Sequence, residues 1–564
     1  MRSLTVTVLA LAACSSHSGA TGDGAVDSPV GDAAHDAPAD AATDAGPPVI
    51  TAALFGLQVN HADPALQMMP GDFVMATPMR IWDTSYPKPL EWPGINTCPA
   101  NTNCAADPRL SKFDWTMLDA YLARIHNSPD VLYVLGRTPS WASQRGSRCT
   151  VAVNDSTCTG AEDNSCDYND EGGNSGGGGQ CETNVDLLPD GTGSNATFRH
   201  WVYNLVQHVA TQDHGTYAHI AYYEIWNEPY RSQTLWSAPN CGSKTTKYGV
   251  CAFNGTYAQL LRMTQDARCI IEGHPDDPIT ATGMTCATDP DLPAIGLDPT
   301  AKIVSASGTA KDPGFTQNEL YCSGSGADAP PDNAFCTSGD AGSKAVDVVN
   351  THNYFAGAAL PESSAANMKT IQDALSDADR AKPYFDDEGG GDWKGSNSTP
   401  YDPDLEETTP LRWFLALWNQ GAARAYWYTW DGNGPLWNPK GFADCTADNG
   451  CLSKAGTAYA AALQWLVGKT AACTVNGTMW QCNLATATAK SIVMWDFGAC
   501  KSTGIAPPCD SSKSSKNCVF ARDCTTTDVP LPAGSWTDWR DLDTNSSHAI
   551  GTTIPVGIKP IMLE

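Results

Sequence analysis

The stretch Ala221-Tyr-Tyr-Glu-Ile-Trp-Asn-Glu-Pro229 decides the fold that we predict for this chain. Its apolar and aromatic run is typical of a buried strand, and Pro229 ends that strand directly after an amide and a carboxylate. In a (β/α)8 barrel, residues at the carboxyl ends of the strands converge on one pocket. We therefore expect Asn227 and Glu228 at such a pocket, where a second acid has to join them.

A second acid stands in Lys382-Pro-Tyr-Phe-Asp-Asp-Glu-Gly-Gly390, where a short apolar segment runs into carboxylates and then into glycines. Glycines let the backbone turn sharply and approach a ligand closely. The candidate, Glu388, lies 160 positions after Glu228 (388 − 228). This spacing allows about three further strand and helix units of roughly 30 or more residues each, which places the two glutamates on strands four and seven.

Paired carboxylates on separate strands suit the hydrolysis of a glycosidic bond. One carboxyl group must be protonated to donate to the leaving oxygen, and the other must be ionised to attack the anomeric carbon or to activate water. A neighbouring negative charge and partial burial raise the pKa of the acid, whereas hydrogen-bond donors keep the second group charged. The alternative interpretation is that both glutamates are ordinary surface or salt-bridge acids.

These two segments resemble the clan A glycoside hydrolases, which are retaining (β/α)8 barrels, and most closely glycoside hydrolase family 39 and its relatives. By position, the resemblance implies that Glu228 is the acid/base, that Asn227 contacts the sugar 2-hydroxyl and that Glu388 is the nucleophile. The chain departs from the family where Asp386 and Asp387 precede Glu388, since many relatives have a threonine or serine there. Asp387 is therefore the alternative nucleophile, although the spacing to the following glycine favours Glu388.

The resemblance covers about residues 52–468 and implies further pocket residues on strands two, six and eight and after strand three. An arginine on strand two would hydrogen-bond the nucleophile, and a tryptophan on strand eight would form the floor under the sugar. In chain order these residues are Arg80, Trp141, His352, Tyr354 and Trp430. Aromatic faces stack well on sugar rings, but tryptophan and histidine on strands are also common core residues, so both interpretations stay open.

The N-terminus is typical of an exported bacterial protein. Residues 1–14 hold one arginine, an apolar run and Leu11-Ala-Ala-Cys14, which resembles a lipobox whose cysteine, Cys14, is lipidated. Residues 15–49 contain almost no large apolar residue and predict a flexible acidic linker. We expect a protein at the cell envelope or surface that contacts the membrane only through a lipid anchor. The alternative is an unprocessed soluble N-terminus.

The cysteine count agrees with export. Of 21 cysteines, 20 remain after Cys14 is set aside (21 − 1), an even number compatible with disulfides in an oxidising compartment. The spacings do not repeat the CxxC pattern of zinc ribbons, so we expect no metal. Our hypothesis is that close neighbours pair: Cys98 with Cys104, Cys149 with Cys158, Cys166 with Cys181, Cys241 with Cys251, Cys322 with Cys336, Cys445 with Cys451, and Cys473 with Cys482.

The charge of the chain limits its partners. The formal net charge of −28 (34 − 62) argues against nucleic acid and disfavours anionic polysaccharides, because both would be repelled. A neutral oligosaccharide or polysaccharide is therefore the expected substrate, and hydrolysis of this kind requires no cofactor.

Length and pattern predict two folded domains. A chain of 564 residues, 41% of them apolar, is long enough for a large barrel over residues 50–468 and a smaller domain over residues 469–564. After a helix at 456–468, short alternating segments indicate a β-sandwich. Its strands are expected at residues 479–484, 491–497 and 557–563.

Two long segments are predicted as insertions. Residues 144–196 follow strand three, which puts them over the catalytic face as a cysteine-containing loop, and residues 286–345 lie between the proposed strands five and six. Four side chains of the first insertion offer oxygen ligands for calcium, but their spacing does not match the EF-hand loop. They are Asp163, Asp167, Asn169 and Asp170.

The sequence therefore predicts a retaining glycoside hydrolase that cleaves a β-linked extracellular glycan through a glycosyl-enzyme intermediate. This mechanism predicts carboxyl groups about 5–5.5 Å apart, whereas a separation of roughly 6.5–9.5 Å would favour inversion. Two alternatives remain: a non-catalytic surface lipoprotein that binds glycans, and a transglycosylase that uses the same residues.

Overall fold

The computed structural model describes most of the chain after residue 47. The described residues are 48–60, 69, 77–86, 88–139, 141–142, 184–229, 255–309, 313–322, 339–355, 360–390, 403–431, 436–437, 452–506, 519–542 and 544–564. Several predicted features lie outside them: Cys14, nearly all of the acidic linker, and the four candidate calcium ligands. Within the described residues, no helix is long and apolar enough to cross a membrane.

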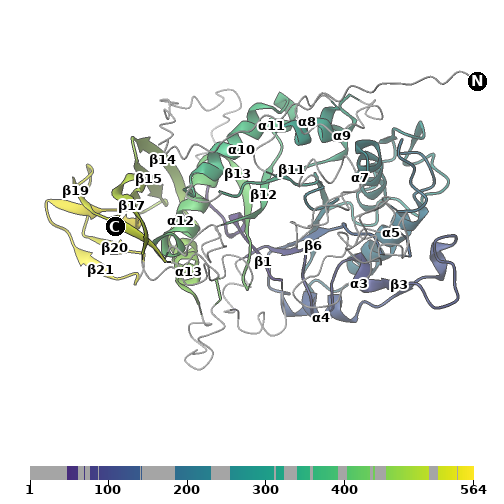
Figure 1. Ribbon diagram of the computed structural model, residues 1–564, viewed down its shortest axis with the longest axis horizontal. Coiled ribbons are helices and arrows are strands. Elements are labelled where there is room, and N and C mark those ends of the chain that lie inside the picture. The colour runs from purple at the N-terminus through teal and green to yellow at the C-terminus, as the bar shows by residue number, and fades with distance from the viewer. Residues whose placement is uncertain are drawn as a thin grey trace, which may run out of the picture. The chain divides into compact units, whose positions relative to one another are not determined.

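Eight strand positions, all paired in parallel, form the central sheet (Figure 1). The first and last of them, β1 and β13, pair with each other, and the two pieces of the fifth, β9 and β10, pair with β6 and β11, so the sheet curls into a barrel. In chain order the strands are β1 (Phe55–Gln58), β2 (Met79–Ile81), β5 (Val131–Val134), β6 (Ile220–Glu224), β9 (Lys302–Val304) with β10 (Gly308–Thr309), β11 (Val349–His352), β12 (Tyr384–Gly389) and β13 (Ala422–Trp427). The predicted (β/α)8 barrel is confirmed.

Helices follow the strands along the chain and pack their apolar side chains against the sheet in one continuous core. Their starts follow capping rules: Thr256 and Gln259 form a capping box before α7, and the Ser453 side chain accepts from Gly456 before α13. The helices are α3 (Trp92–Ile95), α4 (Thr116–Arg124), α5 (Ala196–Ala210), α7 (Tyr257–Ile271), α8 (Pro313–Tyr321), α9 (Ala341–Ala345), α10 (Ser363–Asp373), α11 (Asp377–Arg380), α12 (Pro403–Asn419) and α13 (Lys454–Leu466). Short elements complete this part: η1 (Ala52–Leu54), β3 (Asn96–Thr97), η3 (Pro108–Leu110), β4 (Lys112–Phe113), β7 (Pro278–Ile279) and β8 (Met284–Thr285).

An apolar layer inside the barrel determines which side chains point inward. Buried side chains from five strand positions meet in one cluster, with Tyr222 packed against it: Leu132, Val304, Val348, Phe385 and Tyr426. Since side chains alternate along a strand, the residues two positions further toward the carboxyl end face the same interior. For Tyr222 and Phe385 these residues are Glu224 and Asp387. A polar layer therefore lies directly above the apolar one.

The fifth strand corrects one prediction. We expected residues 286–345 to be an insertion between strands five and six, and this is wrong, because β9, the fifth strand itself, lies inside that segment. β9 has only three residues and is followed by serines at 305 and 307, so it lacks the long apolar run by which a strand is recognised in a sequence.

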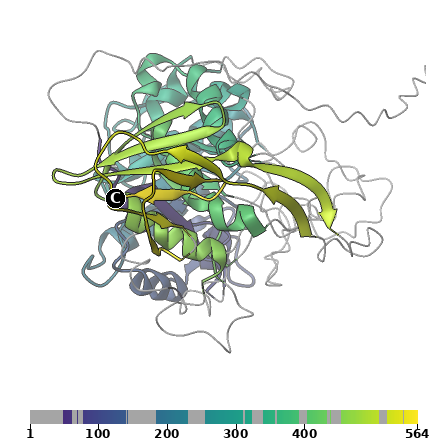
Figure 2. The same ribbon diagram turned by 90° about the vertical axis from the view of Figure 1, so that its left-hand side faces the viewer.

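The C-terminal part is a β-sandwich (Figure 2). A six-stranded antiparallel sheet and the pair β19–β22 share an apolar core of residues such as Ile492, Leu563 and Ile554. The large sheet is β14 (Thr470–Asn476), β15 (Met479–Ala485), β16 (Lys490–Asp496), β23 (Ile561–Leu563), β20 (Asp538–Asp541) and β21 (Ser547–Ala549). The remaining elements are β17 (Cys500–Ala506) with β18 (Val519–Cys524), β19 (Thr527–Pro530) with β22 (Thr553–Val556), and η8 (Phe497–Ala499).

The first described residues pair with the start of this sandwich. Val49, at the end of the predicted linker, forms an antiparallel bridge with Thr470, and the Ile50 amide donates to the Lys469 carbonyl. Two of the predicted strands match β15 and β16, but the third is shorter than expected. Only Ile561–Leu563 is a strand there, because Pro560 has no amide hydrogen to donate to a ladder.

Three disulfides are described. Two confirm predicted neighbour pairs: Cys98–Cys104, and Cys473–Cys482, which face each other across β14 and β15. The third, Cys269–Cys286, joins the end of α7 to the residue after β8 and was missed, because its cysteines lie 17 positions apart. Cys322 is also disulfide-bonded, and its predicted partner Cys336 lies outside the described residues. Eight further cysteines of the predicted pairs also lie outside the described residues: Cys149, Cys158, Cys166, Cys181, Cys241, Cys251, Cys445 and Cys451.

Candidate active site

Strand β6 supplies two carboxylates at different depths. Glu224 is the last residue of the strand and is fully buried, while Glu228 follows four residues later and is 6% exposed. Glu228 has a φ of 40°, a left-handed conformation that non-glycine residues seldom adopt. Ser307, after β9, contacts both residues: its Oγ donates to Glu224 Oε1 at 2.7 Å and accepts from the Glu228 amide at 3.2 Å. The predicted position of Glu228, after strand four, is confirmed.

Strand β12 brings two consecutive acids to the same side. Alternation would send Asp387 and Glu388 to opposite faces of the sheet, but the pairing of β12 with β13 shifts register between Asp386 and Gly389. Through this bulge both side chains reach the same arginine, Arg80. Two residues after Glu388, Gly390 has a φ of 126°, a conformation that requires glycine, and a Cβ there would also lie 3.3 Å from Trp427.

Arg80, on β2, connects these acids. Its Nη1 donates to Glu388 Oε2 at 2.8 Å and to Gln58 Oε1 at 2.9 Å. Its Nη2 donates to Glu224 Oε2 at 2.8 Å and to Asn227 Oδ1 at 2.5 Å, and its Nε lies 3.0 Å from Asp387 Oδ2. The expected contact between the strand-two arginine and Glu388 is present.

Strand β11 supplies His352 and, two residues later, Tyr354. The fully buried His352 ring lies between two carboxylates, with Nδ1 2.8 Å from Glu228 Oε1 and Nε2 2.9 Å from Asp387 Oδ1. The Tyr354 hydroxyl donates to Glu388 Oε1 at 2.8 Å. Both predicted residues of strand six therefore contact the acidic cluster.

Burial and charge divide the acids into neutral and ionised groups. Burial raises the pKa of Glu224 well above its ordinary value, despite the nearby Arg80. Burial would also raise the pKa of Asp387, but Arg80 and His352 hold it well below its usual range. Burial would lower the pKa of His352, yet Glu388 and Asp387 raise it well above its ordinary value. The cluster therefore contains two cations, Arg80 and His352, beside an ionised Asp387.

The geometry separates Asp387 from Glu388. Asp387 is completely buried and both of its oxygens are engaged, one with Arg80 and one with His352, whereas Glu388 is 7% exposed. An oxygen of Glu228 and an oxygen of Glu388 lie within 4.8 Å of one another. The accessible pair of carboxylates is thus Glu228 and Glu388, and Asp387 lies in the layer beneath them.

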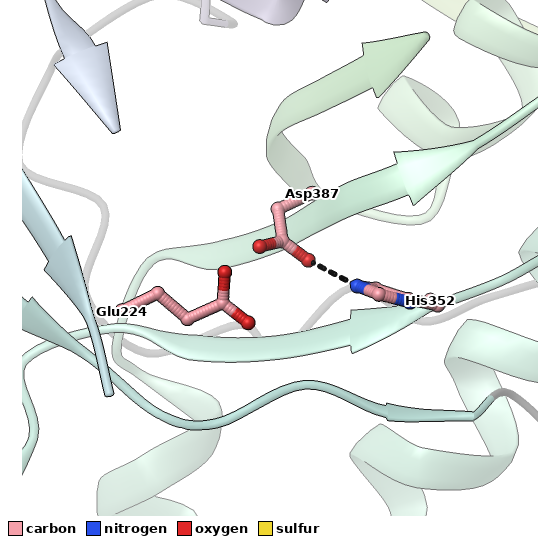
Figure 3. Close-up of side chains that lie close together, drawn as sticks. All are labelled: Glu224, His352 and Asp387. Atoms are coloured by element: carbon pink, nitrogen blue, oxygen red, sulfur yellow. Dashed lines mark ion pairs between the residues drawn. The ribbon is translucent and has the colours of Figure 1, made fainter. Parts of the chain in front are cut away.

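Two sets of side chains in this cluster lie close enough together to hold a metal ion. One is Glu224, His352 and Asp387, whose side chains converge in Figure 3; the other is Glu228, His352 and Glu388. In both sets the carboxylates already pair with the Arg80 guanidinium or with the His352 ring. These carboxylates fit the two side-chain cations, Arg80 and His352, better than a metal ion. A metal ion would be a third positive charge and would have to displace Arg80 or His352 from the carboxylates.

The two predicted tryptophans have different surroundings. Trp430 is fully buried in the main core, and its amide donates to the Gln58 carbonyl at 2.8 Å, which places it next to a residue that contacts Arg80. Trp141 is partly exposed, and its Nε1 donates to the Asn96 carbonyl at 3.3 Å while its ring packs edge-on against Trp92. The described contacts of Trp141 are thus with the α3–β3 segment and not with the acids.

The residues that hold the predicted site residues in place were not predicted from the sequence. Glu224 and Ser307 were not predicted, nor was Gln58, although each contacts a predicted residue. A signal for Glu224 exists, since a single acid inside an apolar strand has to find an internal partner. Nothing in the sequence around Ser307 or Gln58 points to the site.

Comparisons with known proteins find similarity in structure only. No family model matches the chain, and no curated protein matches it. The chain is similar to the structure of a family 39 glycoside hydrolase from the gut symbiont Bacteroides cellulosilyticus WH2, at 12% identity and a TM-score of 0.49, over 92% of this chain and 82% of that chain. It is similar to a GH30 endoxylanase from Clostridium papyrosolvens C71, at 9% identity and a TM-score of 0.41, over 92% and 97%. A third similarity is to a conserved exported protein from Bacteroides fragilis, at 11% identity and a TM-score of 0.43, over 80% of each chain.

Proposed function

We propose that this protein is a retaining glycoside hydrolase that cleaves β-linked bonds in a neutral glycan outside the cell. The observation that carries the proposal is the pair Glu228 and Glu388, which extend from strands four and seven of the barrel with oxygens within 4.8 Å of one another. Retaining enzymes have carboxyl groups about 5–5.5 Å apart, whereas inverting enzymes need roughly 6.5–9.5 Å to admit a water molecule. One oxygen of each carboxyl group lies within 4.8 Å of the other, which is compatible with the close approach of the two groups in a retaining enzyme.

In the proposed mechanism Glu388 attacks the anomeric carbon while Glu228 protonates the leaving oxygen. The C–O bond to the leaving group breaks and a bond from Glu388 to the sugar forms. Glu228 then takes a proton from the incoming water, whose oxygen displaces Glu388 and releases the sugar. Arg80 and Tyr354 both donate to Glu388, and these donors would stabilise its ionised form.

Asn227 is proposed to bind the sugar, and Trp430 to form the layer under the pocket. Asn227 accepts from Arg80 through Oδ1, so its amide nitrogen is the atom that would donate to a sugar hydroxyl. Trp430 is fully buried, so it would pack beneath the pocket and hold the residues above it in place. We also propose that Trp141, whose side chain is partly exposed after strand three, contacts a more distant part of the substrate.

The proposal includes export and a neutral substrate. The net charge of −28 would repel anionic glycans, and the segment that ends at Cys14 would anchor the protein to the membrane through a lipid. The mechanism uses side chains alone, so we propose that turnover requires neither a metal nor a cofactor.

Sugar release tests this proposal. The purified protein is incubated with neutral β-linked polysaccharides and with aryl β-glycosides, beside Glu388→Gln and the control Asp386→Asn. Asp386 is fully buried, its Oδ1 accepts from the backbone amide of Asn353, and burial raises its pKa to about 8, so an amide is a close substitute. Release by the wild type and the control, but not by Glu388→Gln, is the expected result. Binding of a glycan without release would instead indicate a non-catalytic glycan-binding protein, and longer products would indicate transglycosylation.

A further inference from the structure

Asp387 has no access to a substrate, yet it contacts the active residues from below. Its Oδ1 lies 2.9 Å from His352 Nε2 (Figure 3). Its Oδ2 lies 3.0 Å from Arg80 Nε, and the side chains of Asp387, His352 and Arg80 are all fully buried. Arg80 and His352 hold the pKa of Asp387 well below its usual range, so its carboxylate is ionised. Asp387 is therefore an anion held between two cationic side chains.

A fixed anion determines where the proton of a neighbouring imidazole lies. An ionised carboxylate only accepts hydrogen bonds, so the nitrogen that faces it has to carry hydrogen. Because Asp387 faces Nε2, His352 has its proton on Nε2 in any protonation state that keeps this contact. The other nitrogen, Nδ1, then faces Glu228 Oε1 at 2.8 Å.

We propose that Asp387 is a positioning residue for the acid/base step: by keeping a proton on His352 Nε2 and fixing the ring, it orients Glu228. This inference rests on the proposed function, in which Glu228 protonates the leaving group. Glu228 needs such support because its backbone has a left-handed conformation. The chain Asp387–His352–Glu228 follows the general rule that a buried carboxylate orients an imidazole ring toward a reacting group.

Asp387 is also connected to Glu388, because Arg80 contacts both carboxylates, and this gives a second route by which Asp387 can affect catalysis. The arginine is also held by Gln58, Glu224, Asn227 and Glu388 itself, so it keeps most of its contacts when Asp387 changes. Asp387 is the acid closer to His352 Nε2: its Oδ1 lies 2.9 Å from this nitrogen, whereas Glu388 Oε2 lies 4.0 Å from it. The effect of Asp387 on Glu228 is therefore expected to exceed its effect on Glu388.

Leaving-group dependence distinguishes the two routes. A general acid assists the departure of a poor leaving group and is not needed for an activated one, whereas the nucleophile is needed for both. Asp387→Asn is expected to lower kcat/KM for phenyl β-glycosides at least ~10-fold, out of the ~10²–10⁴ that a general acid supplies, and to leave dinitrophenyl β-glycosides within ~3-fold of wild type. Asp386→Asn, a change of the same type at the preceding buried aspartate, should alter neither substrate. An equal loss for both leaving groups with Asp387→Asn would overturn the inference.

Nitrogen-15 NMR of histidine-labelled protein tests the same inference without a substrate. In the wild type, the signal of His352 is expected to show hydrogen on Nε2, and in Asp387→Asn the Nε2 signal should shift toward that of a ring nitrogen without a carboxylate partner. A wild-type ring with hydrogen on Nδ1 alone would overturn the inference even if Asp387→Asn does not fold. If no glycoside is cleaved but the ring carries hydrogen on Nε2 as expected, the proposed function fails while the role of Asp387 in fixing the ring stands.

Discussion

The Tyr354 hydroxyl donates to Glu388 Oε1 at 2.8 Å. Burial raises the pKa of Glu388, and among the groups that lower it again are His352, Arg80 and this hydrogen bond. Because a nucleophile has to be ionised, the acidic limb of the pH profile is expected above the ordinary glutamate pKa of 4.5. Activity should be lost as the pH falls through that limb.

Tyr354→Phe removes a donor that favours the charged form of Glu388, so the pKa of this carboxyl should rise. A hydrogen bond to a charged group is worth roughly 1.5 kcal/mol or more, which corresponds to a shift of about 1 pH unit. We expect the acidic limb of kcat/KM to move upward by about this amount. Tyr321→Phe is the matched control, since Tyr321 donates to Asp379 away from the site. An unchanged limb would mean that Glu388 does not set it.

Removal of Arg80 should destabilise the protein as well as inactivate it. Arg80→Met leaves Glu224, Asp387 and Glu388 buried without their shared cation. Breaking a buried ion pair from one side costs about 3–5 kcal/mol, so the free energy of unfolding should fall by roughly this amount in denaturant titrations. Arg109→Met is the control, because Arg109 pairs with Asp107 on the surface and its loss should not measurably change the unfolding midpoint. Equal midpoints for the two variants would show that the buried cluster does not depend on Arg80.

Glu228→Gln should separate the acid/base from the nucleophile. Loss of general acid catalysis is expected to lower turnover of poor leaving groups by about 10²–10⁴-fold. With an activated aryl glycoside the glycosyl-enzyme still forms, and azide can attack it without a general base. Azide should therefore restore turnover of Glu228→Gln and yield a glycosyl azide, which mass spectrometry detects. The Glu388→Gln variant should not yield this β-configured azide, and its appearance there would mean that the roles are reversed.

Trp430 is expected to contribute to stability. Because the side chain is fully buried in the main core, Trp430→Ala should lower the free energy of unfolding by roughly 3–5 kcal/mol. The partly exposed Trp141 serves as the comparison, and Trp141→Ala should cost clearly less in the same chemical denaturation experiment. If the two variants unfold alike, Trp430 is not the packing residue that its burial indicates.

The barrel and the main acids could be predicted because the segments that carry them are strong local signals. Both the Glu228 and the Glu388 segments combine a buried apolar run with an abrupt end, and parallel strands in a barrel bring such ends together. Arg80, His352 and Tyr354 were placed by resemblance, and all three contact the cluster. The sandwich followed from alternating short segments, which β15 and β16 match.

The remainder depends on relationships between distant segments. The bulge in β12, which turns both Asp387 and Glu388 toward Arg80, arises from its register with β13 and leaves no pattern in either strand alone. The three-residue fifth strand was too short to recognise, and with it Ser307 was missed. Cys269 and Cys286 pair across a helix end and a hairpin, so spacing alone could not join them. In each case the determining contact lies outside the local sequence.

The most direct test of the proposed mechanism is the anomeric configuration of the first product, followed by proton NMR during cleavage of a β-linked substrate. Attack by Glu388 followed by attack of water inverts the anomeric carbon twice, so we predict that the β-anomer appears first and then mutarotates. Appearance of the α-anomer first would contradict a glycosyl-enzyme on Glu388 and would assign the pair Glu228 and Glu388 to single-step inversion.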